Sequence, residues 1–144
     1  MEGGGAISVL QLDLGDFDSV RKFAGDVKAL VTRHKLKGIQ ALYNNAGVLR
    51  WQGQVFSKNG FEEHLQANYL GHFLLTRELL PLLLEHKGSR VIHVGSHLAD
   101  YARIRWDNFN DVEGFEAYKQ SKLMQLLHTQ HLHSLHTLHT QHLH

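Results

Sequence analysis

The spacing of apolar residues along the chain limits most strongly how it can fold. Three short apolar runs have the length and composition of strands, at residues 7–12, 39–43 and 90–94. Three longer segments have apolar residues at helical spacing, at residues 19–34, 60–86 and 116–127. Any fold must therefore accommodate strand-like runs that alternate with helices.

Local signals refine these helical segments. Asp16 or Asp18 is expected to cap the first helix, because a carboxylate accepts bonds from the unpaired N–H groups at a helix start. Residues 60–86 are expected to form the longest helix. Pro81 lies inside that segment and predicts a kink or a break into two shorter helices. Residues 97–116 are expected to be a long connection to the third helix.

Length and composition are those of one ordinary globular domain. The chain has 144 residues, of which 42% are hydrophobic and 20% charged, and its net charge of +1 predicts neither nucleic-acid nor membrane attraction. It contains no cysteine, which excludes disulfides and favours a reducing, cytoplasmic location. No run of 18 apolar residues and no signal peptide are found, so no transmembrane segment is expected.

A tyrosine and a lysine four positions apart are the first candidates for chemistry. Tyr118 and Lys122 lie in the third helical segment, where residues i and i+4 share a face at roughly 5–6 Å between Cβ atoms. A cation so close favours the phenolate over the phenol, so the pair can give a proton to a carbonyl or take one from an alcohol. Taken alone, such a pair is more often a surface lysine beside a half-buried tyrosine.

Three further motifs precede this pair. Asn44-Asn45-Ala46-Gly47 follows the second strand-like run, where small residues let a cofactor approach the backbone or simply form a turn. Asn68 is a polar residue on the apolar face of the second helix and needs hydrogen-bond partners if it is buried. Ser96 follows the third strand-like run.

In this order the four motifs resemble those of the short-chain dehydrogenase/reductase family. The segments Gly60 to Thr76 and Ala117 to Leu123 resemble its retinol-dehydrogenase-like branch, and the resemblance covers residues 7–127. It implies an α/β fold, as part of a Rossmann-like, doubly wound parallel sheet. The reaction it implies is the NAD- or NADP-dependent interconversion of an alcohol and a carbonyl.

The resemblance also assigns roles to residues. Tyr118 would act as general acid and base, and Lys122 would assist it and bind the nicotinamide ribose. Ser96 would bond to the substrate oxygen, and Asn68 would hold a water that links Lys122 to solvent. Cofactor contacts are expected from Tyr118 and Lys122, and from a second set nearer the adenosine: Asp13, Asn44, Ala46 and Gly47.

Two features of the family are not found in this sequence. The loop T-G-x-x-x-G-x-G, which follows a strand and binds the pyrophosphate, is absent, since Gly3-Gly4-Gly5 precedes a strand-like run. The first two strands and the C-terminal strands of the sheet are also missing. A sheet of order 3-2-1-4-5-6 would then have a gap between the runs 7–12 and 39–43. Either the sheet re-pairs, or the first run hangs loosely, or another chain fills the gap.

Two functions follow from these observations. The first is an oxidoreductase that acts with NAD or NADP on a small-molecule, lipophilic alcohol or carbonyl, and that is impaired by the missing glycine loop. The second is a catalytically inactive chain that acts by association with other chains. In the family, the helices that match 60–86 and 117–127 often build a dimer interface, which makes a homo-oligomer an expectation.

A His-rich stretch of low complexity ends the sequence. Residues 128–144 repeat the hexapeptide HTQHLH, so we divide the chain into a partial short-chain dehydrogenase/reductase domain, 1–127, and a tail, 128–144. Four histidines recur every three positions, so a helix could direct some of them to one metal ion: His133, His136, His139 and His142. We favour a repetitive extension that binds metal only adventitiously, and we expect no metal site.

Overall fold

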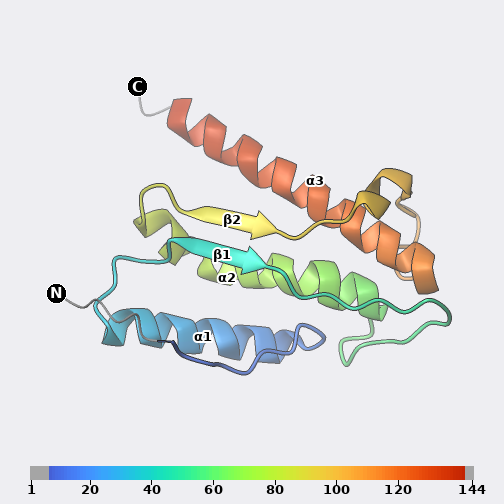
Figure 1. Cartoon of the computed structure of the whole chain (residues 1–144), viewed down its shortest axis with the longest axis horizontal. Helices are drawn as coiled ribbons and strands as arrows, with labels where there is room; N and C mark the ends of the chain where they lie inside the picture. The colour runs from blue at the N-terminus through green and yellow to red at the C-terminus, as the bar shows by residue number, and fades with distance from the viewer. Residues whose placement is uncertain (1–6, 142–144) are drawn as a thin grey trace.

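A short parallel sheet and three longer helices form the structure, a computed structural model that describes residues 7–141 and side-chain surroundings through residue 135 (Figure 1). The main elements follow in the order α1 (Phe17–Arg33), β1 (Ala41–Asn44), α2 (Gly71–Glu85), β2 (Arg90–His93) and α3 (Gly114–Gln141). Strands β1 and β2 pair in parallel, with Ala41 opposite Arg90 and Asn44 opposite His93. The expected α/β class with neighbouring second and third strand-like runs is confirmed.

Helix α1 begins where an aspartate caps it and packs against α2. Of the two predicted caps, Asp16 is the one used, because its side chain accepts the N–H of Asp18 at 2.9 Å. Lys58 forms an ion pair with the same carboxylate at 2.7 Å and joins a distant loop to the helix start. The main core lies between the two helices and consists of Leu14, Val20, Ala24, Leu75, Leu79 and Leu83.

The predicted first strand, residues 7–12, is not a strand in the structure. The side chains of Ile7 and Val9 are 93% and 91% exposed. A strand needs a hydrogen-bonded neighbour, and within the described residues the sheet contains β1 and β2 alone. The run does not join the sheet, although Leu12 at its end packs against the core. Of the three outcomes expected for the gap, re-pairing of this run is thus not found among the described residues.

The second helical segment changes its hydrogen-bonding pattern where it carries Asn68. A π-helical turn, η1 (Leu65–Leu70), leads directly into α2. Such turns are rare and occur frequently at functional sites. Pro81 does not divide α2, so the predicted break into two helices is wrong. Because Pro81 is exposed, water can reach the carbonyl that lacks its usual N–H donor.

Helix α3, with 28 residues, is longer than the segment predicted to be longest. It carries Tyr118 and Lys122 and continues past residue 127, the expected end of the domain. His128 is 7% exposed and lies against the rings of Tyr69 and Phe73, at 6.2 and 4.9 Å between ring centroids. The division into domain and tail stays a prediction. The glycines of residues 1–6, His142 and the side chains of His136 and His139 lie outside what the structure describes.

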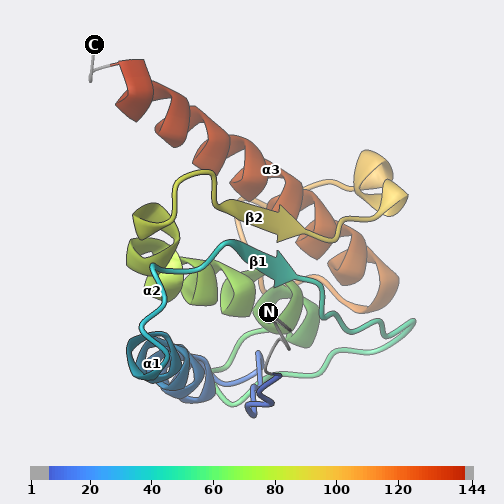
Figure 2. The same ribbon diagram turned by 60° about the vertical axis from the view of Figure 1, so that its left-hand side comes forward.

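The carboxyl ends of both strands point to one end of the molecule. Figures 1 and 2 show both arrows directed toward the side where the N-terminal part of α3 lies. The connection after β2 passes through the short helix η2 (His97–Tyr101), which packs against α3. Ligands of doubly wound sheets bind at the carboxyl ends of the strands. No helix within residues 7–141 is long and apolar enough to cross a membrane.

Candidate functional site

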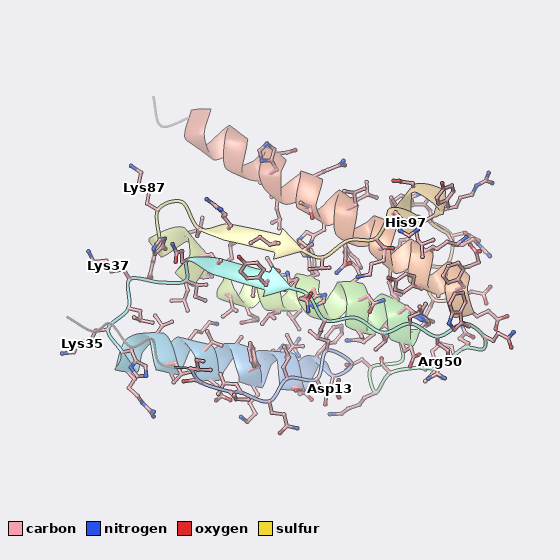
Figure 3. The ribbon with its side chains drawn as sticks, viewed as in Figure 1. Asp13, Lys35, Lys37, Arg50, Lys87 and His97 are labelled. Atoms are coloured by element: carbon pink, nitrogen blue, oxygen red, sulfur yellow. The ribbon has the colours of Figure 1, made fainter. Side chains whose placement is uncertain are left out.

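The predicted site residues lie around the carboxyl ends of β1 and β2. Figure 3 shows Asp13, Arg50 and His97 toward the end to which the strands point, whereas several lysines extend from the opposite end. Asn44 is the last residue of β1, and Ser96 lies three residues after the last residue of β2. The sequence order of the motifs thus becomes a spatial neighbourhood.

Lys122 is buried and bonds the end of a strand. Its side chain is among the buried polar groups, with the residue 4% exposed, and Nζ donates to the carbonyl of Val94 at 3.0 Å. Nζ also lies 5.8 Å from the centre of the Tyr118 ring. Burial lowers the pKa of Lys122 below its ordinary value. The Tyr118 and Lys122 side chains therefore meet as the helical spacing predicted.

Asn68 connects the second helix to two other parts of the site. It is fully buried, and Oδ1 accepts the N–H of Val48 at 2.8 Å. Its Nδ2 donates to the carbonyl of Val48 and to Oγ of Ser121, both at 3.0 Å. Sequence reasoning missed Ser121, although it directly precedes Lys122. The expected need of Asn68 for partners is met by the residue after Gly47 and by α3.

The Ser96 side chain is oriented by a backbone N–H two residues further along the chain. Its Oγ accepts the N–H of Leu98 at 3.2 Å and caps η2. Within residues 7–135 no hydrogen bond joins the hydroxyls of Ser96 and Tyr118. The helix η2, which Ser96 caps, packs against α3, the helix that carries Tyr118.

The residues expected near the cofactor divide into buried and open positions. Asn44 is 1% exposed and its Nδ2 donates to Thr76 at 2.9 Å, while its Oδ1 has no partner in the described part of the chain. Ala46 and Gly47 are exposed. A Cβ at Gly47 would lie 3.3 Å from Oδ1 of Asn68, so a larger residue would crowd this side chain. Asp13 lines a cavity of about 310 Å³.

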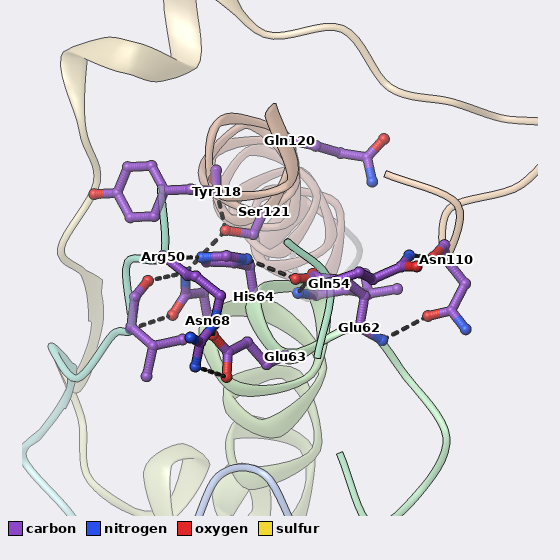
Figure 4. A network of polar contacts seen from close by, with 12 residues as sticks. Arg50, Gln54, Glu62, Glu63, His64, Asn68, Asn110, Tyr118, Gln120 and Ser121 are labelled. Atoms are coloured by element: carbon purple, nitrogen blue, oxygen red, sulfur yellow. Dashed lines mark hydrogen bonds and ion pairs between the residues drawn. The ribbon is translucent and has the colours of Figure 1, made fainter. Parts of the chain in front are cut away.

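Sequence reasoning also missed a buried pair beneath Tyr118. His64 and Glu62 are 0% and 1% exposed, and their Nδ1 and Oε1 atoms are 2.6 Å apart. The rings of His64 and Tyr118 form a T-shaped pair, with 6.1 Å between ring centroids and 81° between the planes (Figure 4). The pair lies within the segment Gly60 to Thr76, whose sequence served only to identify the family branch.

A larger cavity lies away from all of these residues. Its volume is about 560 Å³, and its lining includes Phe61, Leu65, Tyr69, Trp106, Phe109 and Met124. None of the predicted catalytic or cofactor-binding residues lines it. Among the described residues, no group of three or more histidine or acidic side chains is arranged to hold a metal ion.

Sequence comparisons identify close relatives of part of the chain. The model of the short chain dehydrogenase family matches residues 1–110. Polyprenol dehydrogenase of Mus musculus is 42% identical over 113 residues, which are 76% of this chain and 31% of that protein. Retinol dehydrogenase 11 of Homo sapiens is 38% identical over 117 residues, 80% of this chain and 34% of that protein. The chain thus spans about a third of the length of these relatives.

Solved structures share the fold. A protein from Mycobacterium paratuberculosis superposes with a TM-score of 0.76 at 34% identity, covering 94% of this chain and 47% of that one. A short chain dehydrogenase from Burkholderia cenocepacia J2315, in complex with NADP, gives 0.61 at 25% identity and covers 85% and 44%. Both likenesses confirm a partial Rossmann-like architecture.

Proposed function

The chain belongs to the short-chain dehydrogenase family, with retinol-dehydrogenase-like relatives, and from that premise we propose that it carries a site for nicotinamide-dependent interconversion of an alcohol and a carbonyl. One observation carries the proposal. Lys122 is buried beside Tyr118 at the carboxyl end of the sheet, with a backbone carbonyl as its polar partner. A buried ammonium group of this kind is typical of functional sites.

In the proposed reaction, Tyr118 gives a proton to the carbonyl oxygen during reduction and takes it back during oxidation. Lys122 stabilises the phenolate that remains. Because the Ser96 hydroxyl oxygen accepts the N–H of Leu98, its own hydrogen is available to donate to the substrate oxygen. Asn68 holds the residue after Gly47 in place and, in this proposal, a water that links Lys122 to solvent. The nicotinamide supplies or accepts the hydride.

The residues at the sheet end fit the nicotinamide half of the cofactor better than its phosphates. Gly47 presents backbone without a side chain, and Ala46 is exposed beside it. Asp13 lines a cavity that would border the adenosine. No glycine-rich loop that follows a strand is present for the pyrophosphate. We therefore propose NAD or NADP as cofactor, bound weakly by this polypeptide alone.

The substrate we propose is a lipophilic alcohol of the small-molecule class, or its carbonyl counterpart. The names of two relatives, polyprenol dehydrogenase and retinol dehydrogenase 11, support this class. Both names denote long, largely hydrocarbon alcohols, so the reacting oxygen would be the main polar group that the site has to bind.

A turnover assay with a matched variant tests the proposal. Retinaldehyde and short aldehydes would be offered to the chain with millimolar NADH or NADPH, and oxidation of the reduced cofactor followed by absorbance. We expect slow turnover that falls roughly 100-fold or more in Tyr118→Phe, which removes only the proton donor. Equal rates in the two proteins, including no rate in either, would contradict the proposal.

A second candidate function is association with another chain, and the exposed start of the N-terminal run favours it. Ile7 and Val9 are almost fully exposed, and β1 has β2 as its sole strand neighbour among the described residues. Unpaired strand edges of this kind promote pairing between chains. Light scattering of the chain, alone and mixed with a full-length relative, tests this function. A strictly monomeric chain that does not mix would exclude it.

A further inference from the structure

Two side chains of the second helical segment bind the same short stretch of backbone. Asn68 bonds the N–H and the carbonyl of Val48, and Nε2 of His64 accepts the N–H of Arg50 at 2.9 Å. Residues 64 and 68 share a helix face. The N–H groups of residues 48 and 50 point to the same side, as they do in an extended segment. Together the two side chains clamp residues 48–50, the stretch that follows Gly47 (Figure 4).

The hydrogen bonds of His64 determine which of its ring nitrogens carries the proton. Because Nε2 accepts the N–H of Arg50, this nitrogen carries no proton. Nδ1 then carries the ring proton and donates it to Oε1 of Glu62 at 2.6 Å. The other carboxylate oxygen accepts the N–H of Leu65 at 2.9 Å, and the backbone N–H of Glu62 donates to Asn110 at 2.6 Å. Glu62 is therefore held at three points and fixes one neutral tautomer of His64.

The same histidine contacts the proposed general acid. Its ring forms a T-shaped pair with the Tyr118 ring at 6.1 Å between centroids, and both His64 and Glu62 are buried. The Arg50 side chain also forms a partly exposed, bidentate ion pair with Glu63, at 2.7 and 3.4 Å. The bond from the Arg50 N–H to His64 is the one that holds the backbone of residue 50, and its acceptor is fully buried.

We propose that His64, oriented by Glu62, is a positioning residue that holds residues 48–50 at a fixed place beside Tyr118. Loss of its Nε2 acceptor would release the backbone N–H of Arg50 and leave the stretch to Asn68 and to the ion pair between Arg50 and Glu63. The consequence for catalysis rests on the proposed function, because residues 48–50 adjoin the cofactor only if Gly47 borders it. The clamp itself does not depend on turnover.

Two substitutions separate the clamp from simple packing. In His64→Gln the side-chain oxygen can reach the place of Nε2 and accept the Arg50 N–H. In His64→Asn the amide lies near the place of Nδ1, so the bond to Glu62 can form and the bond to Arg50 cannot. The readout is the hydrogen-exchange rate of the Arg50 amide, measured by NMR on the whole chain.

We expect the Arg50 amide to exchange about fivefold faster or more in His64→Asn, which is the loss of one hydrogen bond, and within about twofold of wild type in His64→Gln. Equal exchange in the two variants would overturn the proposal. Imidazole nitrogen shifts of the wild-type chain give a second test that needs no variant. A protonated Nδ1 and a bare Nε2 are expected at His64, and the opposite tautomer would overturn the proposal.

The catalytic consequence is tested separately. In the aldehyde assay, kcat should fall further in His64→Asn than in His64→Gln. If exchange and tautomer behave as expected while wild type and Tyr118→Phe turn over equally, the oxidoreductase is refuted and the clamp stands. If turnover depends on Tyr118 but both His64 variants behave alike, the clamp is refuted and the oxidoreductase stands.

Discussion

A lysine side chain is ordinarily exposed, because burial removes water from its ammonium group. Lys122 is 4% exposed, bonds a backbone carbonyl and has a lowered pKa caused by burial. Within the described residues no carboxylate forms an ion pair with it. A buried ammonium group without a carboxylate partner destabilises the fold. A residue that destabilises the fold in this way is typical of a functional site.

Replacing Lys122 by methionine should therefore stabilise the fold while it removes activity. We expect Lys122→Met to raise the free energy of unfolding by about 0.5–2 kcal/mol, measured by urea denaturation. The exposed Lys87→Met serves as control and should stay within about 0.5 kcal/mol of wild type. Destabilisation by Lys122→Met of more than about 1 kcal/mol would assign the lysine a structural role instead.

At the scale of elements, three histidines join α2, β2 and α3: His72 and His128 are buried, and His93 is half-buried. His72 bonds the carbonyl of Asn68 at 2.9 Å, and the rings of His93 and His128 lie 5.3 Å apart. Both ring nitrogens of His93 lack partners among the described residues. Burial lowers the pKa of all three, and that of His93 to about 4, with neighbouring His128, His72 and Lys122 adding to the effect.

This junction should weaken in acid. The unfolded chain protonates His93 near its ordinary pKa of 6.5, whereas the folded chain does so only near 4. The free energy of unfolding is therefore not reduced by His93 above pH 6.5, and it decreases as the pH falls from 6.5 to about 4. His93→Phe should flatten this decline in urea denaturation, because phenylalanine binds no proton. The substitution breaks no side-chain hydrogen bond among the described residues. His34→Phe, at an exposed position, should leave the decline unchanged; equal slopes in both variants would contradict this assignment.

The contact between α2 and the start of the core depends on a glycine. A Cβ at Gly71 would lie 2.6 Å from the carbonyl oxygen of Leu14, whereas one at Gly25 in α1 would meet nothing within 4 Å. We expect Gly71→Ala to destabilise the chain by about 1–3 kcal/mol. Gly25→Ala should stabilise it by about 0.5–1 kcal/mol, because alanine favours a helix interior. Thermal unfolding measures both, and equal melting temperatures would refute the packing described.

The sequence was sufficient for elements that depend on local patterns. The paired strands were found because apolar runs end at Gly and polar residues, and Tyr118 and Lys122 were found because helical spacing fixes their distance. The prediction of a strand at residues 7–12 was wrong because a strand also needs a hydrogen-bonded neighbour, which the segment itself cannot supply. The π-helical turn at Asn68 was missed because a shift in backbone bonding leaves the apolar spacing almost unchanged. The clamp of His64 was missed because the N–H that it binds comes from Arg50, 14 residues away in the sequence.

At the scale of the whole molecule, the chain is a partial version of a larger fold. Its superposition on the protein from Mycobacterium paratuberculosis includes 94% of this chain but 47% of that protein. The described part supplies the carboxyl ends of two neighbouring strands and the helix with Tyr118 and Lys122. Tyr118 and Lys122 thus lie at the carboxyl end of β2, while a glycine-rich loop for the pyrophosphate is not in this sequence.

This imbalance predicts weak cofactor binding by the polypeptide. Without amides from a glycine-rich loop at a helix N-terminus, the pyrophosphate charge has no dedicated partners. Calorimetric titration with NADPH and NADH should give dissociation constants weaker than micromolar. Micromolar binding by the isolated 144-residue chain would contradict the prediction.

The most direct test of the proposed site is a map of where the cofactor contacts the chain. Backbone amide shifts measured by NMR, with and without millimolar NADPH, locate the contact without need of turnover. We predict the largest changes at Gly47, Ser96, Tyr118 and Lys122, around the carboxyl ends of β1 and β2. Changes confined to the cavity near Trp106 and Phe109, or no changes at all, would contradict the account.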